Sequence, residues 1–366
     1  MNGKRTFIIY ALCFAAFIGL IAAANGQVQG QILGEVESLV YSPDGSKIAV
    51  ASGRIRILDA TTSDQLHTVG ASTRSVNSVS WSPDGSRIAS SSWEGTGFVW
   101  DATTGAQVSM YAGSGYGARS LFNVEWSPVD DRIVIQGGGI YTDIWDGVTG
   151  QGIGPLVFDV ATYAVGAVTW SPDGNRMAIT TLDNKIEIFD VNPVKATLEY
   201  WPLLLRFDSG PVYELDWSRD GRWIAGAVGG EVHIFDASNG QVVQTLTGGT
   251  NTLLVVAWSP DGSRIAAGGM DKMVRVWEVA TSEQVAVFDH GTTVNTLDWN
   301  PNGEALAYGG AVNPAGSVLD IVDVPAPAAT PLPINTPTNT PRGTEGRTGG
   351  RGIKTVLSTD LQGQLD

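Results

Sequence analysis

Hydrophobic and polar residues alternate with period two in short segments along most of the chain, which is the pattern of half-buried β-strands. In "VNSVSW" the side chains of Val79 and Trp81 share one strand face, and in "VYELDW" Leu215 and Trp217 do the same. Turn residues follow each segment directly, and patterns of helical period are few. The sequence therefore predicts an all-β protein.

One ten-residue phrase recurs seven times. It reads "WSPDGSRIAS" from Trp81 and "WSPDGSRIAA" from Trp258, and the other copies start at Tyr41, Trp126, Trp170, Trp217 and Trp299. Successive starts are 40, 45, 44, 47, 41 and 41 residues apart. A period of about 40–45 residues is the one that a four-stranded propeller blade requires.

Each copy predicts four strands. In "SPDG" the proline fixes φ at the first turn position, aspartate tolerates the second, and glycine takes a conformation that is costly for other residues. A second strand follows, as at Ile88–Ser90, and then a third with an apolar-x-apolar-aromatic-acid pattern such as "VRVWE". The fourth begins with glutamine and an aliphatic residue, as at Gln241 and Val242.

These units resemble the WD-repeat family of β-propellers over residues 27–324. The resemblance implies a seven-bladed β-propeller of four-stranded antiparallel blades, similar to bacterial members. The family's Gly-His pair is missing throughout. The aspartate that the family carries in the turn at the third strand is matched only at Asp183 and Asp271, with Glu94 a near match. The family's buried His–Asp network is therefore not expected. Propellers of periplasmic translocation proteins and of prolyl-peptidase lids share the "SPDG" motif and are the alternative within this fold.

The seventh repeat lacks a fourth strand of its own. After its third strand, "VLDIVDV", the chain continues as "PAPAATPLP", and proline cannot donate to a strand ladder. Near the N-terminus "QVQGQIL", residues 27–33, has the glutamine-aliphatic start of a fourth strand. We therefore predict a propeller over residues 25–324 that is closed by this N-terminal strand. Residues 325–366, rich in Pro, Thr and Gly, are predicted to be a disordered tail.

The first 24 residues predict export. Lys4 and Arg5 precede an apolar run over residues 7–23 that ends in the small residues Ala22 and Ala24, which is the pattern of a cleaved signal peptide. An uncleaved anchor helix is the alternative. The only cysteine, Cys13, lies in this run, so the mature chain would have no disulfide and no thiolate metal site. We expect an extracellular, periplasmic or cell-envelope location.

Composition and charge narrow the class of partner. The 366 residues include 46 Gly and 12 Trp, and only 16% are charged. The formal net charge is -15, whereas a nucleic acid duplex or an anionic membrane requires clustered Lys and Arg. The sequence therefore predicts no nucleic acid partner, and a membrane contact only if the N-terminal segment is uncleaved.

Catalytic constellations are absent from the sequence. The three histidines are His67 and His233, placed by repeat position on outer strands, and His290, placed in a connecting loop. No G-x-S-x-G elbow, H-E-x-x-H helix or EF-hand-like string is present, so we predict no catalytic, cofactor or metal residue. A hydrolase or lyase with carboxylates from different blades at the channel mouth stays an alternative, although the sequence shows no such pair.

Partner binding is the predicted function. In the family, the connections between blades and the turns between second and third strands share one face, and aromatic and Arg residues there are typical of interface hot spots. The candidates are Arg74, Trp93, Tyr111, Tyr116, Arg119 and Met270, with Trp201 in the longest insertion as a separate site. Alternatively, Tyr111 packs on its own blade, Trp93 fills a groove between blades, and the insertion is buried. We predict a monomeric, non-catalytic scaffold for a protein or peptide, with a purely structural envelope domain as a further alternative.

Overall fold

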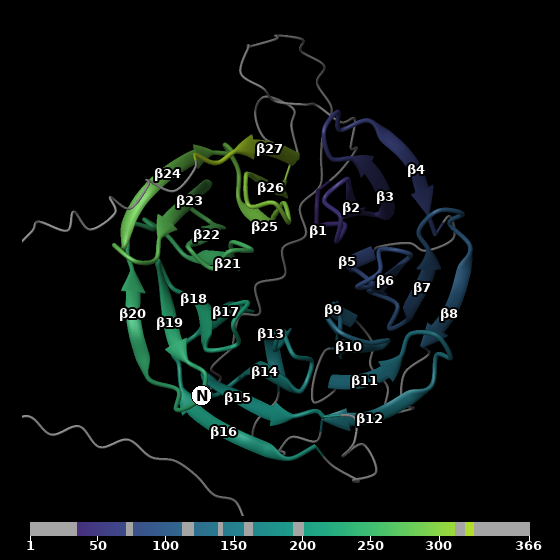
Figure 1. The fold of residues 1–366 in the computed structure, drawn as a ribbon, viewed down its shortest axis with the longest axis horizontal. Coiled ribbons are helices and arrows are strands. Elements are labelled where there is room, and N and C mark those ends of the chain that lie inside the picture. Colours follow the sequence, from purple (N-terminus) through teal and green to yellow (C-terminus); the bar gives the residue numbers. More distant parts are fainter. Residues whose placement is uncertain are drawn as a thin grey trace, which may run out of the picture. The chain divides into compact units, whose positions relative to one another are not determined.

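The strands form seven antiparallel sheets arranged around a central axis (Figure 1). The computed structural model describes residues 35–70, 76–111, 121–137, 142–156, 164–192, 201–311 and 319–325. In these ranges there is no helix long and apolar enough to cross a membrane. The chain separates into two units, Met1–Pro327 and Ala328–Asp366, and the second lies outside the described ranges. The predicted all-β, seven-bladed propeller is confirmed.

Blades 1 to 4 each contain four strands in sequence order. Blade 1 comprises β1 (Ser38–Tyr41), β2 (Lys47–Ser52), β3 (Arg54–Asp59) and β4 (Gln65–Val69). Blade 2 comprises β5 (Val76–Trp81), β6 (Arg87–Ser92), β7 (Gly97–Asp101) and β8 (Gln107–Tyr111). Blade 3 comprises β9 (Leu121–Trp126), β10 (Arg132–Gly137), β11 (Thr142–Asp146) and β12 (Gly152–Leu156). Blade 4 comprises β13 (Ala164–Trp170), β14 (Arg176–Thr181), β15 (Lys185–Asp190) and β16 (Leu203–Asp208).

The remaining blades follow the same order, except that blade 7 has three strands in the described residues. Blade 5 comprises β17 (Val212–Trp217), β18 (Trp223–Val228), β19 (Glu231–Asp236) and β20 (Val242–Leu246). Blade 6 comprises β21 (Leu253–Trp258), β22 (Arg264–Gly269), β23 (Met273–Glu278) and β24 (Glu283–Asp289). Blade 7 comprises β25 (Val294–Trp299), β26 (Ala305–Gly310) and β27 (Leu319–Asp323).

The strand predicted to complete blade 7, residues 27–33, lies outside the described residues. The described chain nevertheless starts in contact with that blade. The backbone N–H of Val36 donates to the Gly310 carbonyl at 2.9 Å, and Asn295 Nδ2 donates to Glu35 Oε1 at 2.8 Å. The start of the described chain therefore lies against blade 7 before β1 begins.

The hydrophobic core lies between neighbouring blades. One buried cluster combines Ile57 of blade 1 with Trp81 and Ile88 of blade 2. Another joins Tyr41 of blade 1 to Leu319 of blade 7, so apolar packing closes the ring. Because the repeated aromatic ends each inner strand on its inter-blade face, the "W-S-P-D-G" phrase marks the residues that hold blades together.

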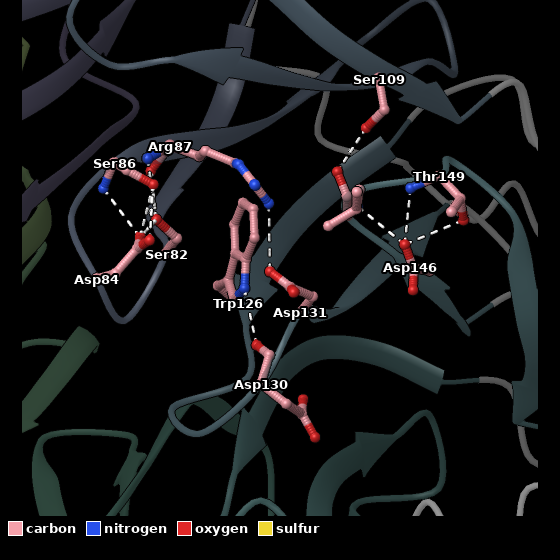
Figure 2. Close-up of polar contacts among 12 residues, drawn as sticks. Ser82, Asp84, Ser86, Arg87, Ser109, Trp126, Asp130, Asp131, Asp146 and Thr149 are labelled. Atoms are coloured by element: carbon pink, nitrogen blue, oxygen red, sulfur yellow. Dashed lines mark hydrogen bonds and ion pairs between the residues drawn. The ribbon is translucent and has the colours of Figure 1, made fainter.

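The "SPDG" turns are built by their own side chains. Figure 2 shows Ser82 Oγ donating to Asp84 Oδ1 at 2.6 Å and accepting the Arg87 N–H at 2.9 Å. The Ser86 N–H donates to the same aspartate oxygen at 3.0 Å. Gly85 has a φ of +69°, which is costly for residues with a Cβ. The repeat's turn sequence is thus explained by local geometry, as predicted.

The arginine at the start of several second strands reaches the next blade. The Arg264 guanidinium lies 5.1 Å from the ring centroid of Trp299 and donates to the Gly303 carbonyl at 2.9 Å. The same stacking joins Arg132 to Trp170 and Arg176 to Trp217. Blade 7 has alanine at this position, and there Asn300 Nδ2 donates to the Gly45 carbonyl of blade 1 at 3.3 Å.

Candidate functional site

Two faces of the propeller carry different kinds of connection. The N–H of His290, which follows β24, donates to the carbonyl of Lys272 in the β22–β23 turn at 2.9 Å. Gly249, after β20, donates in the same way to Gly230 in the β18–β19 turn at 3.1 Å. Connections between blades therefore share one face with the turns between second and third strands. We call this the crossover face and the opposite one the PDG face.

Exposed apolar and aromatic side chains occur at several points of the crossover face. Trp93, in the β6–β7 turn, has 50% of its surface exposed, and Leu182, in the β14–β15 turn, has 56%. Tyr213, near the start of β17, is also exposed, and Met270 in the β22–β23 turn is half-buried. The structure thus places Trp93 and Met270 where the sequence predicted them. Half of the Trp93 surface is open to solvent.

Tyr111 does not contribute an accessible side chain. It is 5% exposed, at the end of β8, and its ring centroid lies 5.4 Å from that of Trp145 in blade 3. Its hydroxyl donates to Asp143 of the same blade. The proposed partner-binding role is therefore corrected, because Tyr111 packs between blades 2 and 3. The alternative interpretation had placed it on its own blade.

Trp201 is also buried. It is 7% exposed and belongs to a cluster with Ile144 of blade 3 and Phe189 of blade 4. Trp201 therefore lies between blades 3 and 4, and it is not an accessible binding residue. Leu203 and Leu204, which follow on the outer strand β16, are about half exposed. Arg74, Tyr116 and Arg119 lie outside the described residues.

The histidines occupy three different environments. His67 lies on the outer strand β4, as predicted, and its Nε2 lies 2.7 Å from the Ala102 carbonyl. His233 lies on the third strand β19 and not on an outer strand, so that prediction was wrong. His290 is buried in its connecting loop, with Nδ1 2.7 Å from Oδ2 of Asp320 in β27. A buried His–Asp pair is therefore present, although the missing Gly-His motif gave no reason to expect one.

The inner strands of the seven blades enclose a cavity of about 360 Å³ along the propeller axis. Most of its wall comes from residues one and three positions before each repeat's aromatic. Five carboxylates line it, namely Glu37, Glu125, Glu214, Asp216 and Asp298. None of the described residues that line it is Lys, Arg or His. The described part of the channel wall is therefore acidic and contains no cationic side chain.

Three of these carboxylates also join blades. Asp216 Oδ2 accepts the backbone N–H of Trp258 at 2.7 Å, and Asp298 Oδ2 accepts that of Tyr41 at 2.7 Å. Glu125 Oε1 makes the equivalent contact to blade 4 at 3.3 Å. Because only one oxygen of each aspartate makes this contact, the aspartates combine an inter-blade role with a charge in the channel wall.

Burial raises the pKa values of the channel carboxyls. It raises the pKa of Glu214 to about 8, with the charge of Asp216 adding to the effect. Burial raises the pKa of Asp216 to about 7 against the hydrogen bond from Trp258. Asp298 reaches a pKa of about 7 through burial and the charge of Asp216. Burial also raises the pKa of Glu125 well above its usual range. Carboxyls with such values retain protons near neutral pH.

Sequence reasoning did not single out these carboxylates. Glu37 lies just before β1 and the others lie on β9, β17 and β25, and no two of these strands are neighbours in the sequence. Aligning the position before each repeat's aromatic would have shown Glu125, Asp216 and Asp298 in one column. Among the described residues no group of three or more His, Cys, Asp or Glu side chains is placed to hold a metal ion.

Comparison with known proteins supports the repeat assignment. The family model "WD domain, G-beta repeat" matches residues 63–101, 156–190, 203–236 and 240–278. An uncharacterized WD repeat-containing protein of Synechocystis sp. is 29% identical over 147 residues, which are 40% of this chain and 41% of that protein. Intraflagellar transport protein 122 homolog of Xenopus tropicalis is 32% identical over 96 residues, 26% of this chain and 8% of that protein.

Transcription factor unc-37 of Caenorhabditis elegans is 30% identical over 138 residues, 37% of this chain and 22% of that protein. The chain thus covers less than half the length of each of these curated relatives. The matched segments fall on blades 1 and 2 and on blades 3 to 6 of the propeller. The chain therefore carries WD40 repeats in a seven-bladed β-propeller.

Proposed function

We propose that this propeller is an exported, monomeric, non-catalytic scaffold that binds a protein partner through its crossover face. WD40 propellers are commonly protein-interaction scaffolds, and the matched relatives have names of WD-repeat, transport and transcription proteins. The observation that carries the proposal is the exposure of Trp93 and Leu182 at turns of this face. Large apolar side chains of this kind lose water when a partner covers them, and tryptophan is enriched at interface hot spots.

The test compares two exposed positions on the crossover face with one exposed position on the PDG face. Trp93→Ala and Leu182→Ala are each expected to weaken binding of a partner captured by the wild-type protein, with Kd rising about fivefold to thirtyfold at a hot spot. Val148, exposed in the β11–β12 turn on the PDG face, provides the matched control Val148→Ala. Thermal melting should change little for all three. If all three variants bound the partner with the affinity of the wild type, the crossover face would not be the binding site.

The channel carboxylates support a second candidate function. A carboxylate hydrolase needs acid groups from different strands at one cavity and a proton-holding carboxyl beside them. Asp216 on β17 and Asp298 on β25 both line the cavity, and burial raises the pKa of each to about 7. Incubation with chromogenic glycosides, comparing wild type with Asp216→Asn, tests it. Turnover lost in Asp216→Asn would favour the hydrolase, and no turnover by the wild type would leave the scaffold as the function.

A further inference from the structure

The outer strand of blade 6 has an open edge. β24 lies on the circumference of the ring (Figure 1), and no described strand pairs with its outer side. It is the longest described outer strand, with seven residues, whereas β16 has six and the others have five, and β12 contains Pro155. Backbone N–H and C=O groups along such an edge can pair with an added strand, so natural edges are often short, charged or interrupted by proline.

The strand register identifies the backbone groups that face this edge. The N–H of His290 donates to the Lys272 carbonyl at 2.9 Å, and residues 286–289 continue in the same register along β23. Hydrogen-bonded and non-hydrogen-bonded pairs alternate in an antiparallel ladder. The backbone groups of Val287 and Asp289 therefore point away from β23. The register shift of β24 lies before this stretch, so residues 286–289 present a regular edge.

The two sides of β24 differ in exposure. Ala286 and Phe288 are half-buried and pack against the core cluster that contains Tyr308 of blade 7. Val287 and Asp289 lie on the other side and are exposed, with 46% of the Val287 surface open to solvent. The side chains of an added strand would therefore lie opposite one exposed valine and one exposed carboxylate, and cross-strand pairs of this kind select the sequence of the added strand.

The charge of Asp289 is not balanced from the neighbouring strand. Met273, which is uncharged, lies directly opposite it on β23, and its Oδ1 accepts the N–H of Gly291 at 2.8 Å. In blade 4 the equivalent residue of the outer strand, Asp208, lies directly opposite Lys185, whose Nζ is 2.5 Å from Oδ1 of the aspartate. Blade 4 thus neutralises the end of its outer strand within the blade. The equivalent carboxylate of blade 6 is complementary to a cation on an added strand.

A second copy of this chain fits the edge poorly. Antiparallel registers that pair the regular stretches of two β24 strands place Asp289 opposite its own counterpart, opposite Val287 or opposite Val285. Like charges directly opposite each other destabilise a sheet, and a carboxylate against a valine loses water without gaining a partner. The complementary strand therefore has a sequence different from that of β24.

We propose that the open edge of β24 binds an extended segment of a partner protein, which adds to the four-stranded sheet of blade 6 as a further antiparallel strand. The segment carries a basic residue opposite Asp289 and, two positions later, an aliphatic residue opposite Val287. Main-chain hydrogen bonds supply affinity, and the two side-chain pairs supply specificity. This surface is separate from Trp93 and Leu182, so the inference goes beyond the proposed function.

The probe is the fluorophore-labelled peptide Thr-Lys-Thr-Val-Thr-Val-Thr, titrated with the full-length protein at low ionic strength. Fluorescence anisotropy should show binding, and replacing the lysine by glutamate should raise Kd about fivefold. Methylation of the backbone nitrogens of the lysine and the first valine, which face β24, should abolish binding. Methylation of the two threonine nitrogens that follow the lysine and that valine should change Kd by less than about twofold, because these nitrogens point away from β24.

Proline substitution locates the site on the protein. Val287→Pro removes an N–H that points away from β23, so β24 should keep its ladder while Kd for the peptide rises at least about tenfold. Thr245→Pro is the matched control in β20, because Thr245 lies opposite His233 as Val287 lies opposite Arg275. This control should leave peptide binding unchanged. Circular dichroism shows whether each variant folds.

Charge variants test the specificity. Asp289→Asn keeps an oxygen for the Gly291 N–H and should abolish the preference for the lysine peptide over the glutamate peptide. Asp208→Asn, in β16, changes the net charge equally and should preserve that preference.

Three results would overturn the proposal: no binding of the unmodified peptide, unchanged binding of the peptide methylated at the lysine and first valine, or normal binding by folded Val287→Pro. Dimerisation of the wild type that Val287→Pro removes would overturn it in favour of a second copy. If Val287→Pro does not fold, the methylated peptides decide the question on the wild-type protein. None of these results affects the crossover face, which the Trp93→Ala and Leu182→Ala variants test separately.

Discussion

Arg264 illustrates how one side chain of the repeat joins two blades. It is almost fully buried, stacks on Trp299, and donates to the carbonyls of Gly303 and Pro325 at 2.9 and 2.5 Å. Hydrogen bonds from a charged group contribute about 1.5–3 kcal/mol each, and a desolvated cation–π contact about 2 kcal/mol. These contributions are not additive, because they share one side chain. Arg264→Ala should therefore lower the free energy of unfolding by about 2–4 kcal/mol, measured by urea denaturation.

The control for this prediction is another arginine on a tryptophan. Arg222 lies 5.1 Å from the ring centroid of Trp223, but it is exposed and its stacking partner is the next residue of its own blade. Arg222→Ala should cost less than about 1 kcal/mol, because solvent already hydrates this guanidinium. If both variants lowered the free energy of unfolding equally, the inter-blade contact of Arg264 would add no stability beyond that of an exposed arginine.

The channel carboxyls predict how stability depends on pH. Asp216 and Asp298 have folded-state pKa values of about 7 and Glu214 of about 8, whereas unfolded carboxyls titrate near pH 4. Between pH 4 and pH 8 the folded state therefore binds more protons than the unfolded state. The stability that these groups contribute is fully present below about pH 4 and is lost as pH rises to about 8. Urea denaturation at fixed pH should show this decline between pH 5 and 8.

Substitution identifies the groups responsible. Asp216→Asn keeps an oxygen for the Trp258 N–H and removes a titrating group, so the decline between pH 5 and 8 should become shallower. Asp236, the last residue of β19, has a pKa lowered by hydrogen bonds from Ser238, and its contribution is lost only as pH falls below about 4. Asp236→Asn should leave the slope above pH 5 unchanged. An unaltered slope in Asp216→Asn would contradict the assignment.

At the scale of elements, the sequence predicted the strands and turns within each repeat, but it did not predict the side-chain packing between neighbouring blades. The "SPDG" turns and the strand order follow from local residues, because proline, glycine and period-two alternation act within about ten positions. Burial of Tyr111 and Trp201 depends on the neighbouring blade, against which each packs. The channel column at Glu125 and Asp216 depends on strands that are far apart in sequence.

Among the described residues no fourth strand pairs with β27, and this makes the ring-closure prediction testable. Residues 27–33 remain our predicted fourth strand, and the contact of Val36 with Gly310 brings the start of the described chain to blade 7. Deleting residues 25–34 should lower the free energy of unfolding by about 3 kcal/mol or more. The loss comprises several ladder hydrogen bonds at about 1 kcal/mol each and buried aliphatic side chains at about 1.5–3 kcal/mol each. Thermal melting and size-exclusion chromatography would measure it, because an open strand edge also favours association.

The matched truncation removes the other terminus. Val324 is buried and the Pro325 carbonyl accepts a hydrogen bond from Arg264, so the control deletion begins at Ala328. Loss of residues 328–366 should leave the melting temperature unchanged. If this deletion destabilised the protein and removal of residues 25–34 did not, the closing strand would have to come from the C-terminal segment.

At the scale of the whole molecule, the channel exists only when the ring is complete. Its wall takes residues from all seven inner strands, and its aspartates contact the following blade. Any change that opens the ring should therefore alter the channel's charge and proton binding together with stability. The exposed residues of the crossover face differ from the channel wall, because Trp93 and Leu182 each lie on a turn of a single blade.

Export is the prediction that connects the N-terminus to the whole fold. Cleavage after Ala24 would remove the apolar run and leave residues 25–34 ahead of Glu35, so the same cut that releases the protein would free its predicted closing strand. Terminal sequencing of protein recovered from the medium or envelope should begin near Asn25. Ala22→Arg, which places a large charged side chain at the predicted cleavage motif, should retain the uncut form. Recovery of an intact Met1 terminus in the membrane fraction of the wild type would instead show an anchored protein, with the propeller tethered beside its closing strand.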